Sequence, residues 1–403
     1  MSGGGPEPSS PRFLAALCAI AFGCYVAASI RIPVLPLYAR SLGLDATEIG
    51  YINTGFFLVA GVLSVPLGMA SDRVGRRVLV RSGLALLAVA ASLLSVSTTY
   101  GQLLASYTLL GMGVAAFTPT MMSLVADSSP ATHLGRAYGW YTTSLYVGMS
   151  VGPAVGGYLA SHWGYRQAFQ VSAGLLWGVF LLTWRFLARP GTASGVPSGR
   201  ARPKTGIRET LANRRLLGCW VATVGGCYGL GMFLIYFPLH GRAAGLDAGA
   251  VGLVFFTQGL FNAVSRRPLG AWSDRRADRR PWVVLGMVGF ATAMMALGFA
   301  GRSLWFQVVS VGLGVSMGLA FTSVGALTAE VVPPGARGIA MGGYNTSIFL
   351  GMMLNSATMG PVVDRAGFRA GFALAAGVIV GCAGLFWWLT PRLPARGAAP
   401  GGR

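Results

Sequence analysis

The sequence predicts an all-α membrane protein whose twelve transmembrane helices form two pseudo-symmetric six-helix bundles. Composition is the first observation behind this prediction: 54% of the 403 residues are hydrophobic and 10% are charged, whereas soluble globular proteins carry about 25% charged residues. The second is a succession of apolar runs, each close to the ~20 residues with which a helix crosses a bilayer. The third is an internal repeat, because the second half of the chain echoes the first.

Each apolar run is interpreted as a helix because lipid cannot hydrogen-bond the open edge of a β-strand. Residues 189–215 separate the sixth run from the seventh, and their Pro, Gly, Ser and Arg content predicts a cytoplasmic linker. We therefore expect an N-terminal bundle over 1–188 and a C-terminal bundle with a short tail over 216–403. The twelve runs cover about residues 13–38, 47–70, 78–97, 101–126, 135–160, 165–187, 216–240, 249–271, 282–300, 303–330, 337–362 and 368–390.

The repeat is visible at matching positions of the two halves. Pro36-Leu-Tyr-Ala-Arg40 recurs as Pro238-Leu-His-Gly-Arg242, and Pro66-Leu-Gly68 recurs as Pro268-Leu-Gly270. Two copies of six spans in parallel orientation predict two bundles related by an axis along the membrane normal.

The positive charge is unevenly distributed and fixes the expected orientation. The formal net charge is +20, but the basic residues occupy short connectors, which argues against nucleic-acid binding. With the N-terminus inside, both termini are cytoplasmic, because cytoplasmic loops carry an excess of Lys and Arg. All basic residues except Lys204 are arginines, a bias typical of a GC-rich bacterial genome, so we expect a multi-pass protein of the bacterial inner membrane. Of the 31 Lys and Arg residues, the outer connectors then hold Arg40, Arg166, Arg242, Arg302, Arg365 and Arg369.

A charged hinge joins the second and third apolar runs. It reads Gly68-Met-Ala-Ser-Asp72-Arg73-Val-Gly75-Arg76-Arg77 and has a second copy around Asp274. This hinge resembles the loop 2–3 motif of the major facilitator superfamily at every defining position. The resemblance implies the major facilitator fold and secondary active transport by alternating access.

Two further motifs resemble the twelve-helix drug–proton antiporters of that superfamily. Pro33-Val-Leu-Pro36 is similar to their first-helix motif, and the stretch from Gly148 to Gly157 is similar to their helix-five motif. The resemblance implies export of a small hydrophobic or amphipathic compound without a cofactor. Tyr107 departs from the pattern, because the fourth-helix motif has arginine at this position. That departure counts against proton coupling.

The resemblance also implies a gate at the cytoplasmic ends of the helices. Asp72 is expected to face the N-terminus of helix eleven near Gly338, where the helix dipole favours a carboxylate. Arg73 and Arg77 are expected to reach Asp127, and by symmetry Arg275 or Arg279 is expected to reach Glu330. Together these contacts would latch the inside of the outward-open state. The gate residues are Gly68, Asp72, Arg73, Gly75, Arg76, Arg77, Asp127, Asp274, Arg275, Arg279 and Glu330.

The helix-five motif places small residues at helical spacing. Small residues let transmembrane helices approach closely, and a proline inside a helix permits a bend. We interpret this face as a sliding contact between helices five and eight across the bundle interface. Its residues are Gly148, Gly152, Pro153, Gly156 and Gly157.

Arg31 is the main candidate for binding a substrate. It lies within the first apolar run, where a charge costs about 2.5–3.5 kcal/mol on insertion scales and should face a wet cavity or a partner. Snorkelling to the outer interface is the alternative. Gln258 and Asn262 share one helix face and form the better polar pair. The full set of cavity candidates is Arg31, Tyr25, Asn53, Tyr141, Gln258, Asn262 and Asn355.

The eleven acidic residues all fall in connectors, tails or span ends. This favours neutral or anionic cargo, or coupling through a boundary acid such as Asp364, over a buried carboxylate relay. Uptake or exchange of a small organic anion held by Arg31 is therefore one alternative to export, and a non-transporting membrane sensor is another. We expect no metal site and no enzymatic activity, because no nucleophile–base pair or metal-ligand cluster is present. We also expect a monomer that binds a small-molecule substrate in the lipid bilayer.

Overall fold

The computed structural model describes residues 11–129, 133–187, 212–274 and 278–391, and within these ranges every regular element is a helix. The stretches around residues 1–10, 189–211 and 392–403 lie outside the described residues, and with them most of the expected linker. The first-half helices are α1 (Pro11–Ser41), α2 (Ala46–Val74), α3 (Arg76–Val96), α4 (Tyr100–Asp127), α5 (Leu134–His162) and α6 (Tyr165–Phe186).

The second half repeats this arrangement with one long interrupted helix at each end. Its first span begins as α8, passes through the π-helical turn η2 and ends as α9. A short 3-10 turn, η3, precedes the last helix. The bounds are α8 (Arg214–Gly231), η2 (Met232–Tyr236), α9 (Phe237–Ala243), α10 (Ala248–Asp274), α11 (Arg280–Phe299), α12 (Ser303–Glu330), η3 (Pro334–Ala336) and α13 (Arg337–Leu389).

The described residues form twelve crossings, as predicted. Ten helices are long and apolar enough to cross a membrane. Helix α13 counts once among them but contains two crossings, because Gly367 breaks it with a φ of +79°. Helix α5 supplies the twelfth crossing with 29 residues, among which glycine, serine and tyrosine lower the hydropathy.

The repeat extends to the backbone. Gly43 and Gly245 occupy matching positions in the two halves, and both have a φ of +89°. This is a conformation that residues with a Cβ rarely adopt. The same turn therefore leads into α2 in the first half and into α10 in the second.

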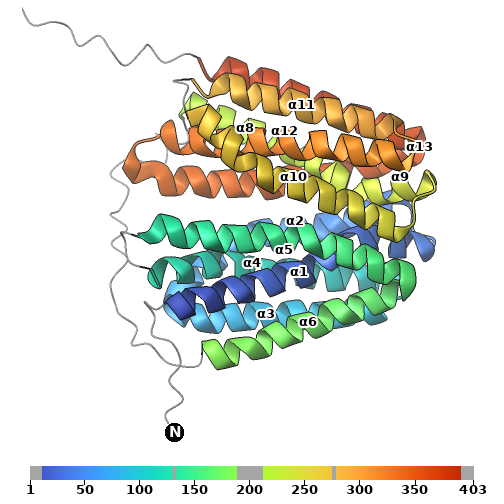
Figure 1. Ribbon diagram of the computed structural model, residues 1–403, viewed down its shortest axis with the longest axis horizontal. Helices are drawn as coiled ribbons and strands as arrows, with labels where there is room; N and C mark the ends of the chain where they lie inside the picture. The colour runs from blue at the N-terminus through green and yellow to red at the C-terminus, as the bar shows by residue number, and fades with distance from the viewer. Residues whose placement is uncertain (1–10, 130–132, 188–211, 275–277, 392–403) are drawn as a thin grey trace, which may run out of the picture.

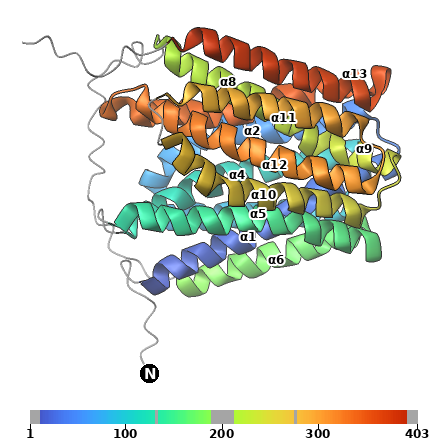
Figure 2. The ribbon, with the colours of Figure 1, turned by 45° about the horizontal axis from the view of Figure 1, so that its top comes forward.

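The helices lie side by side in two groups, α1–α6 and α8–α13 (Figure 1). We call the end of the molecule at which α2 ends and α8 begins the linker end; it is on the left in Figure 1. The opposite end, at which α1 ends and α2 begins, is the far end. Figure 2 shows the same two groups from a second direction. Large apolar side chains on the outer faces are exposed, among them Leu181 at 63% and Trp388 at 66%, as expected for surfaces that contact lipid.

Candidate functional site

The two helix groups meet along two seams, the first of which joins α5 to α10. Gly157 packs directly on the backbone of Ala248 and Gly252, and a Cβ on Gly252 would lie 2.5 Å from the carbonyl oxygen of Pro153. Gly259 packs on Ser150 closer to the middle of the seam. Glycine is needed at these positions because the two backbones touch, leaving no room for a side chain.

The second seam joins α2 to α13 and mirrors the first. Gly360 packs on Ala46 and Thr47, and Gly50 packs on the backbone of Ser356. The hydroxyl groups of Thr54 and Ser356 lie 2.9 Å apart. Both seams therefore close the far end with glycine-to-backbone contacts between the two groups.

Asp364 adds a polar latch to the second seam. Its carboxylate accepts hydrogen bonds from the backbone N–H of Ala46 at 3.0 Å and of Thr47 at 2.9 Å. The hydroxyl of Thr47 donates a third bond of 2.6 Å. These donors form the N-terminus of α2, where unpaired N–H groups and the helix dipole favour a negative charge. The acid thus lies on α13 of one group and caps a helix of the other.

Both seams end near the middle of the molecule. On the second seam, a Cβ on Gly61 of α2 would meet Phe349 of α13 at 3.1 Å. Further along α2, a Cβ on Gly68 would instead meet Pro119 of α4, which belongs to the same group as α2. A Cβ on Gly338 or on Gly342 at the start of α13 would meet no atom within 4 Å. The two groups are therefore in contact at the far end and separate toward the linker end.

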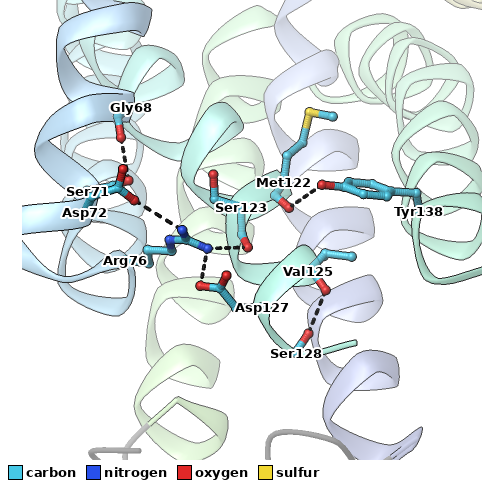
Figure 3. A network of polar contacts seen from close by, with 10 residues as sticks. All are labelled: Gly68, Ser71, Asp72, Arg76, Met122, Ser123, Val125, Asp127, Ser128 and Tyr138. Atoms are coloured by element: carbon cyan, nitrogen blue, oxygen red, sulfur yellow. Dashed lines mark hydrogen bonds and ion pairs between the residues drawn. The ribbon is translucent and has the colours of Figure 1, made fainter. Parts of the chain in front are cut away.

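An ion-pair cluster occupies the linker end of the first group (Figure 3). Arg76 forms an ion pair with Asp127 at the end of α4, and its Nη2 lies 3.2 Å from Oδ1 of Asp72 at the end of α2. Its Nη1 also donates to the carbonyl oxygen of Ser123 at 2.7 Å. Gly75 makes this possible, because its φ of +102° reverses the chain and directs Arg76 toward α4. One guanidinium thus ties α2 and α3 to α4.

The expectation that Arg73 and Arg77 reach Asp127 is wrong, because Arg76 takes that place. Arg77 follows Arg76 on α3 and is rotated by about 100° around the helix axis. It therefore points elsewhere, toward the ring of Phe13 at 6.0 Å. In this conformation Asp72 pairs with Arg76 and not with the N-terminus of helix eleven.

The second group has a smaller cluster at the same end. The Nε of Arg279 donates to Glu330 at 2.8 Å and its Nη1 donates to Ser273 at 3.3 Å. Beside it, Arg280 holds Asp278 with Nη2–Oδ2 at 2.7 Å. Arg279 is one of the two arginines expected to reach Glu330. The other, Arg275, and the side chain of Asp274 lie outside the described residues.

Three of the four helix-five glycines face a different neighbour from the one expected. Gly148, Gly152 and Gly156 pack on α1, against backbone and side-chain atoms between Phe22 and Ile30. Positions four apart share a helix face, and Gly157, about 100° further round, turns to α10 together with the carbonyl of Pro153. The motif therefore supports packing within the first group, and the contact with helix eight rests on its last residues.

Arg31 is buried inside the first group and does not snorkel. It is 7% exposed, and its guanidinium carbon lies 4.9 Å from the ring centre of Phe56 and 5.0 Å from that of Tyr107. Its Nη1 donates to the carbonyl oxygen of Ala28 at 2.9 Å, and its buried Nε has no hydrogen-bond partner. Tyr107 thus stands where the resemblance implies an arginine, and Arg31 brings a guanidinium to its ring from the neighbouring helix.

The other cavity candidates are dispersed. Tyr25 pairs with Thr118 across 3.2 Å, Asn53 donates to its own helix, and Gln258 donates to the sulfur of Met317 at 3.2 Å. Gln258 and Asn262 thus share a face but have separate partners. Two candidates are buried with polar atoms that lack a partner: Tyr141 through its hydroxyl and Asn355 through both atoms of its amide.

Sequence reasoning missed Arg266, the partner of Asn262. Its Nε donates to Oδ1 of Asn262 at 2.8 Å, and its guanidinium carbon lies 4.1 Å from the ring centre of Tyr146 on α5. The signal was present, because Arg266 and Arg267 interrupt the apolar run 249–271, but an excess of arginine on the cytoplasmic side already accounts for them in the sequence. The structure places Arg266 at the inner end of the first seam.

Comparison with known proteins decides the family. The model of the Major Facilitator Superfamily matches residues 17–275 and 227–403. The chain belongs to this superfamily. It is therefore a multi-pass membrane transporter of small molecules and not an enzyme.

Its relatives include proteins that are named for multidrug resistance. The multidrug resistance protein MdtG of Yersinia enterocolitica is 26% identical over 391 residues, covering 92% of each chain. An uncharacterized MFS-type transporter of Methanocaldococcus jannaschii is 23% identical over 86% of this chain and 92% of its own. Among solved structures, an inward-facing, occupied bacterial homolog of the human lysosomal transporter Spinster matches 96% of this chain and 97% of its own with a TM-score of 0.78 and 15% identity.

Proposed function

We propose that this protein is a secondary active transporter of the bacterial inner membrane that exports small hydrophobic or amphipathic compounds by alternating access. Export is the function that the name of the relative MdtG suggests, and the excess of arginine at the linker end supports a cytoplasmic position for that end and for both termini. With this orientation, the separation of the two groups at the linker end corresponds to an inward-facing state.

The observation that carries this proposal is the position of the two seams. Glycine-to-backbone contacts and the Asp364 latch close the far end, whereas the ion pairs of Arg76 and Arg279 stay within their own groups at the linker end. A protein that alternates between two open states needs such a difference between its ends. Bundles over 1–188 and 216–403, joined by the linker 189–215, would rock about the middle of the seams.

Asp364 is the acid that we propose for coupling to protons. Its carboxylate faces the α2 N-terminus at the far end and is the one acid among the described residues with hydrogen bonds across a seam. Loss of this negative charge would weaken the contact with the helix N-terminus and would favour opening of the far end. No cofactor is needed for this cycle, and a monomer suffices for it.

Transport by the purified protein in proteoliposomes tests the proposal. We expect a neutral amphipathic dye to move from the linker end toward the far end when a pH gradient is imposed. An equal rate in control liposomes without the protein would contradict it. Movement only toward the linker side would favour uptake instead.

A second candidate function is uptake or exchange of a small organic anion held by Arg31. The unpartnered Nε of this buried arginine favours it. Transport of a radiolabelled organic acid by the wild type and its loss in Arg31→Ala would support this candidate. Unchanged transport in Arg31→Ala would refute it.

A further inference from the structure

The interior of the membrane-spanning region carries positive charge without a matching negative charge. Arg31 is buried on α1, and Arg266 lies on α10 five residues beyond the helix midpoint. The acidic residues all lie in connectors, tails or helix ends. Among the described residues, no carboxylate lies within ion-pairing distance of either arginine. A charge at this depth is expensive unless a partner or water compensates it.

Arg266 lies where the space between the two groups begins. The α5–α10 seam runs from Gly157 and Gly252 at the far end to Ser150 and Gly259 in the middle. Further toward the linker end, Arg266 of α10 stacks on Tyr146 of α5. Beyond it, a Cβ on Gly139 of α5 would meet no atom within 4 Å. A molecule that enters from the linker end therefore meets this arginine at the closed end of the opening.

The arrangement of the Arg266 side chain leaves its terminal nitrogens for a ligand. Asn262 accepts from Nε at 2.8 Å and fixes the orientation of the guanidinium, while the Tyr146 ring covers one face at 4.1 Å. Both residues are uncharged, so they orient the cation without neutralising it. The Nη pair of a guanidinium binds carboxylates, sulfonates or phosphates with two parallel hydrogen bonds.

We propose that the cargo is an amphipathic organic anion, whose acidic group pairs with Arg266 and whose apolar part lies against Tyr146 between the two groups. This proposal rests on the proposed export function and adds its substrate class. Because α5 and α10 belong to different groups, a ligand at this position contacts both. Its negative charge also compensates the positive charge of Arg266, which would repel a cation at this position.

A matched pair of fluorescent probes tests the proposal on the full-length protein. Dansylglycine carries a carboxylate, and dansylamide has the same aromatic body without a charge. We expect the wild type to bind and transport dansylglycine. The substitution Arg266→Gln should weaken dansylglycine binding at least tenfold, while its affinity for dansylamide should stay within about twofold of the wild-type affinity. Arg267→Gln is the control, because this neighbouring arginine is exposed on the same helix, and its affinity for dansylglycine should equal that of the wild type.

Further variants separate ligand binding from a structural role. Arg266→Lys keeps the charge but lacks the planar fork, so we expect partial recovery of dansylglycine binding. Tyr146→Leu removes the ring and should weaken the binding of both probes. The thermal shift produced by dansylglycine on each purified variant gives a readout that does not depend on transport. A variant that unfolds early but keeps the wild-type shift would contradict the assigned role.

The outcomes distinguish the two proposals. If dansylamide or ethidium is transported but dansylglycine is not, the anion proposal is overturned and the export proposal is unaffected. An equal loss of binding of both probes in Arg266→Gln overturns the anion proposal as well, because the arginine would then support packing and not bind the acidic group. Transport of none of the three compounds overturns the export proposal and the substrate class with it.

Discussion

The far end and the linker end of this transporter are closed by different chemistry. At the far end, glycines place the backbones of the two groups in contact, and Asp364 adds hydrogen bonds across the seam. At the linker end, arginine and carboxylate side chains form ion pairs, but each pair remains within one group. Contacts between close-packed backbones act only at short range, whereas charged side chains can exchange partners as the helices move. The difference indicates that close backbone packing closes the far end, whereas charged side chains at the linker end are available to form contacts between the groups in the other state.

Two acids occupy related places in this scheme. Asp364 is near the far end of the first crossing of α13 and caps the N-terminus of α2. Asp72 is at the linker end of α2, and the resemblance implies that it faces the N-terminus of helix eleven. Each acid would then cap the helix that carries the other, one in each state. In this structure only the Asp364 contact is formed, and Asp72 pairs with Arg76.

Breaking the backbone contact should have the largest effect. Gly157→Val places a branched side chain against Ala248 and Gly252, and overpacking of this kind costs about 1–3 kcal/mol. We expect at least a tenfold loss of transport in proteoliposomes, with the protein still inserted in the membrane. Gly377→Val is the matched control, because a Cβ at that position meets no atom within 4 Å. Equal transport by both variants would show that the seam does not need close approach.

Loss of the Asp364 charge should have the next largest effect. In Asp364→Asn the amide nitrogen faces backbone N–H donors, so at least one of the three hydrogen bonds is lost. Hydrogen bonds to charged groups contribute about 1.5–3 kcal/mol, and we expect transport to fall about three- to tenfold. A cysteine introduced by Thr54→Cys should also be labelled faster by an impermeant maleimide from the far side.

Asp247→Asn provides the control for this experiment. Asp247 accepts from the N–H of Ala250 at 2.7 Å at the same end of the molecule, but it caps α10 within its own group. We expect its substitution to leave maleimide labelling unchanged. Similar labelling in both variants would mean that helix capping alone, without a contact across the seam, accounts for the effect.

Asp72→Asn should separate stability from transport. The side chain of Asp72 is 42% exposed in its pair with Arg76, and exposed pairs contribute about 0–1 kcal/mol. The melting temperature should therefore change little. Transport should fall about three- to fivefold if Asp72 caps helix eleven in the other state. Normal flux together with an unchanged melting temperature would refute the linker-end gate.

The smallest effect is expected for Arg279→Ala. Arg279 pairs with the carboxylate of Glu330, which is 51% exposed, whereas Arg76 ties two acids and a carbonyl group together. We expect about a twofold loss of transport for Arg279→Ala and a larger loss for Arg76→Ala, measured side by side. The reverse order would assign the stronger latch to the second group.

The ion pairs illustrate how far sequence reasoning reaches. The hinge motif identified Asp72, Asp127 and the arginines between them, but assigned Asp127 to Arg73 and Arg77. The structure assigns it to Arg76, because the positive φ at Gly75 sets the direction in which α3 begins. A shift by one residue rotates a side chain by about 100°, and no spacing rule in the sequence fixes that starting angle.

Arg266 shows a second kind of limit. Two arginines inside the apolar run 249–271 were visible in the sequence, yet the count of basic residues on the two sides of the membrane placed them on the cytoplasmic side. Only the packing of α10 against α5 shows that one arginine turns toward Tyr146 and the other is exposed. The same holds for the helix-five glycines, whose face toward α1 could not be distinguished from a face toward α10.

The sequence by itself determined the number and length of the crossings, their internal repeat and the family. These properties follow from local hydropathy and from motifs whose residues are close together in the chain. The tertiary structure decided which end is closed, which arginine meets which acid and where an uncompensated cation faces the space between the groups. These depend on helix rotation and on contacts between residues that are far apart in the chain, and hydrophobic patterning constrains neither.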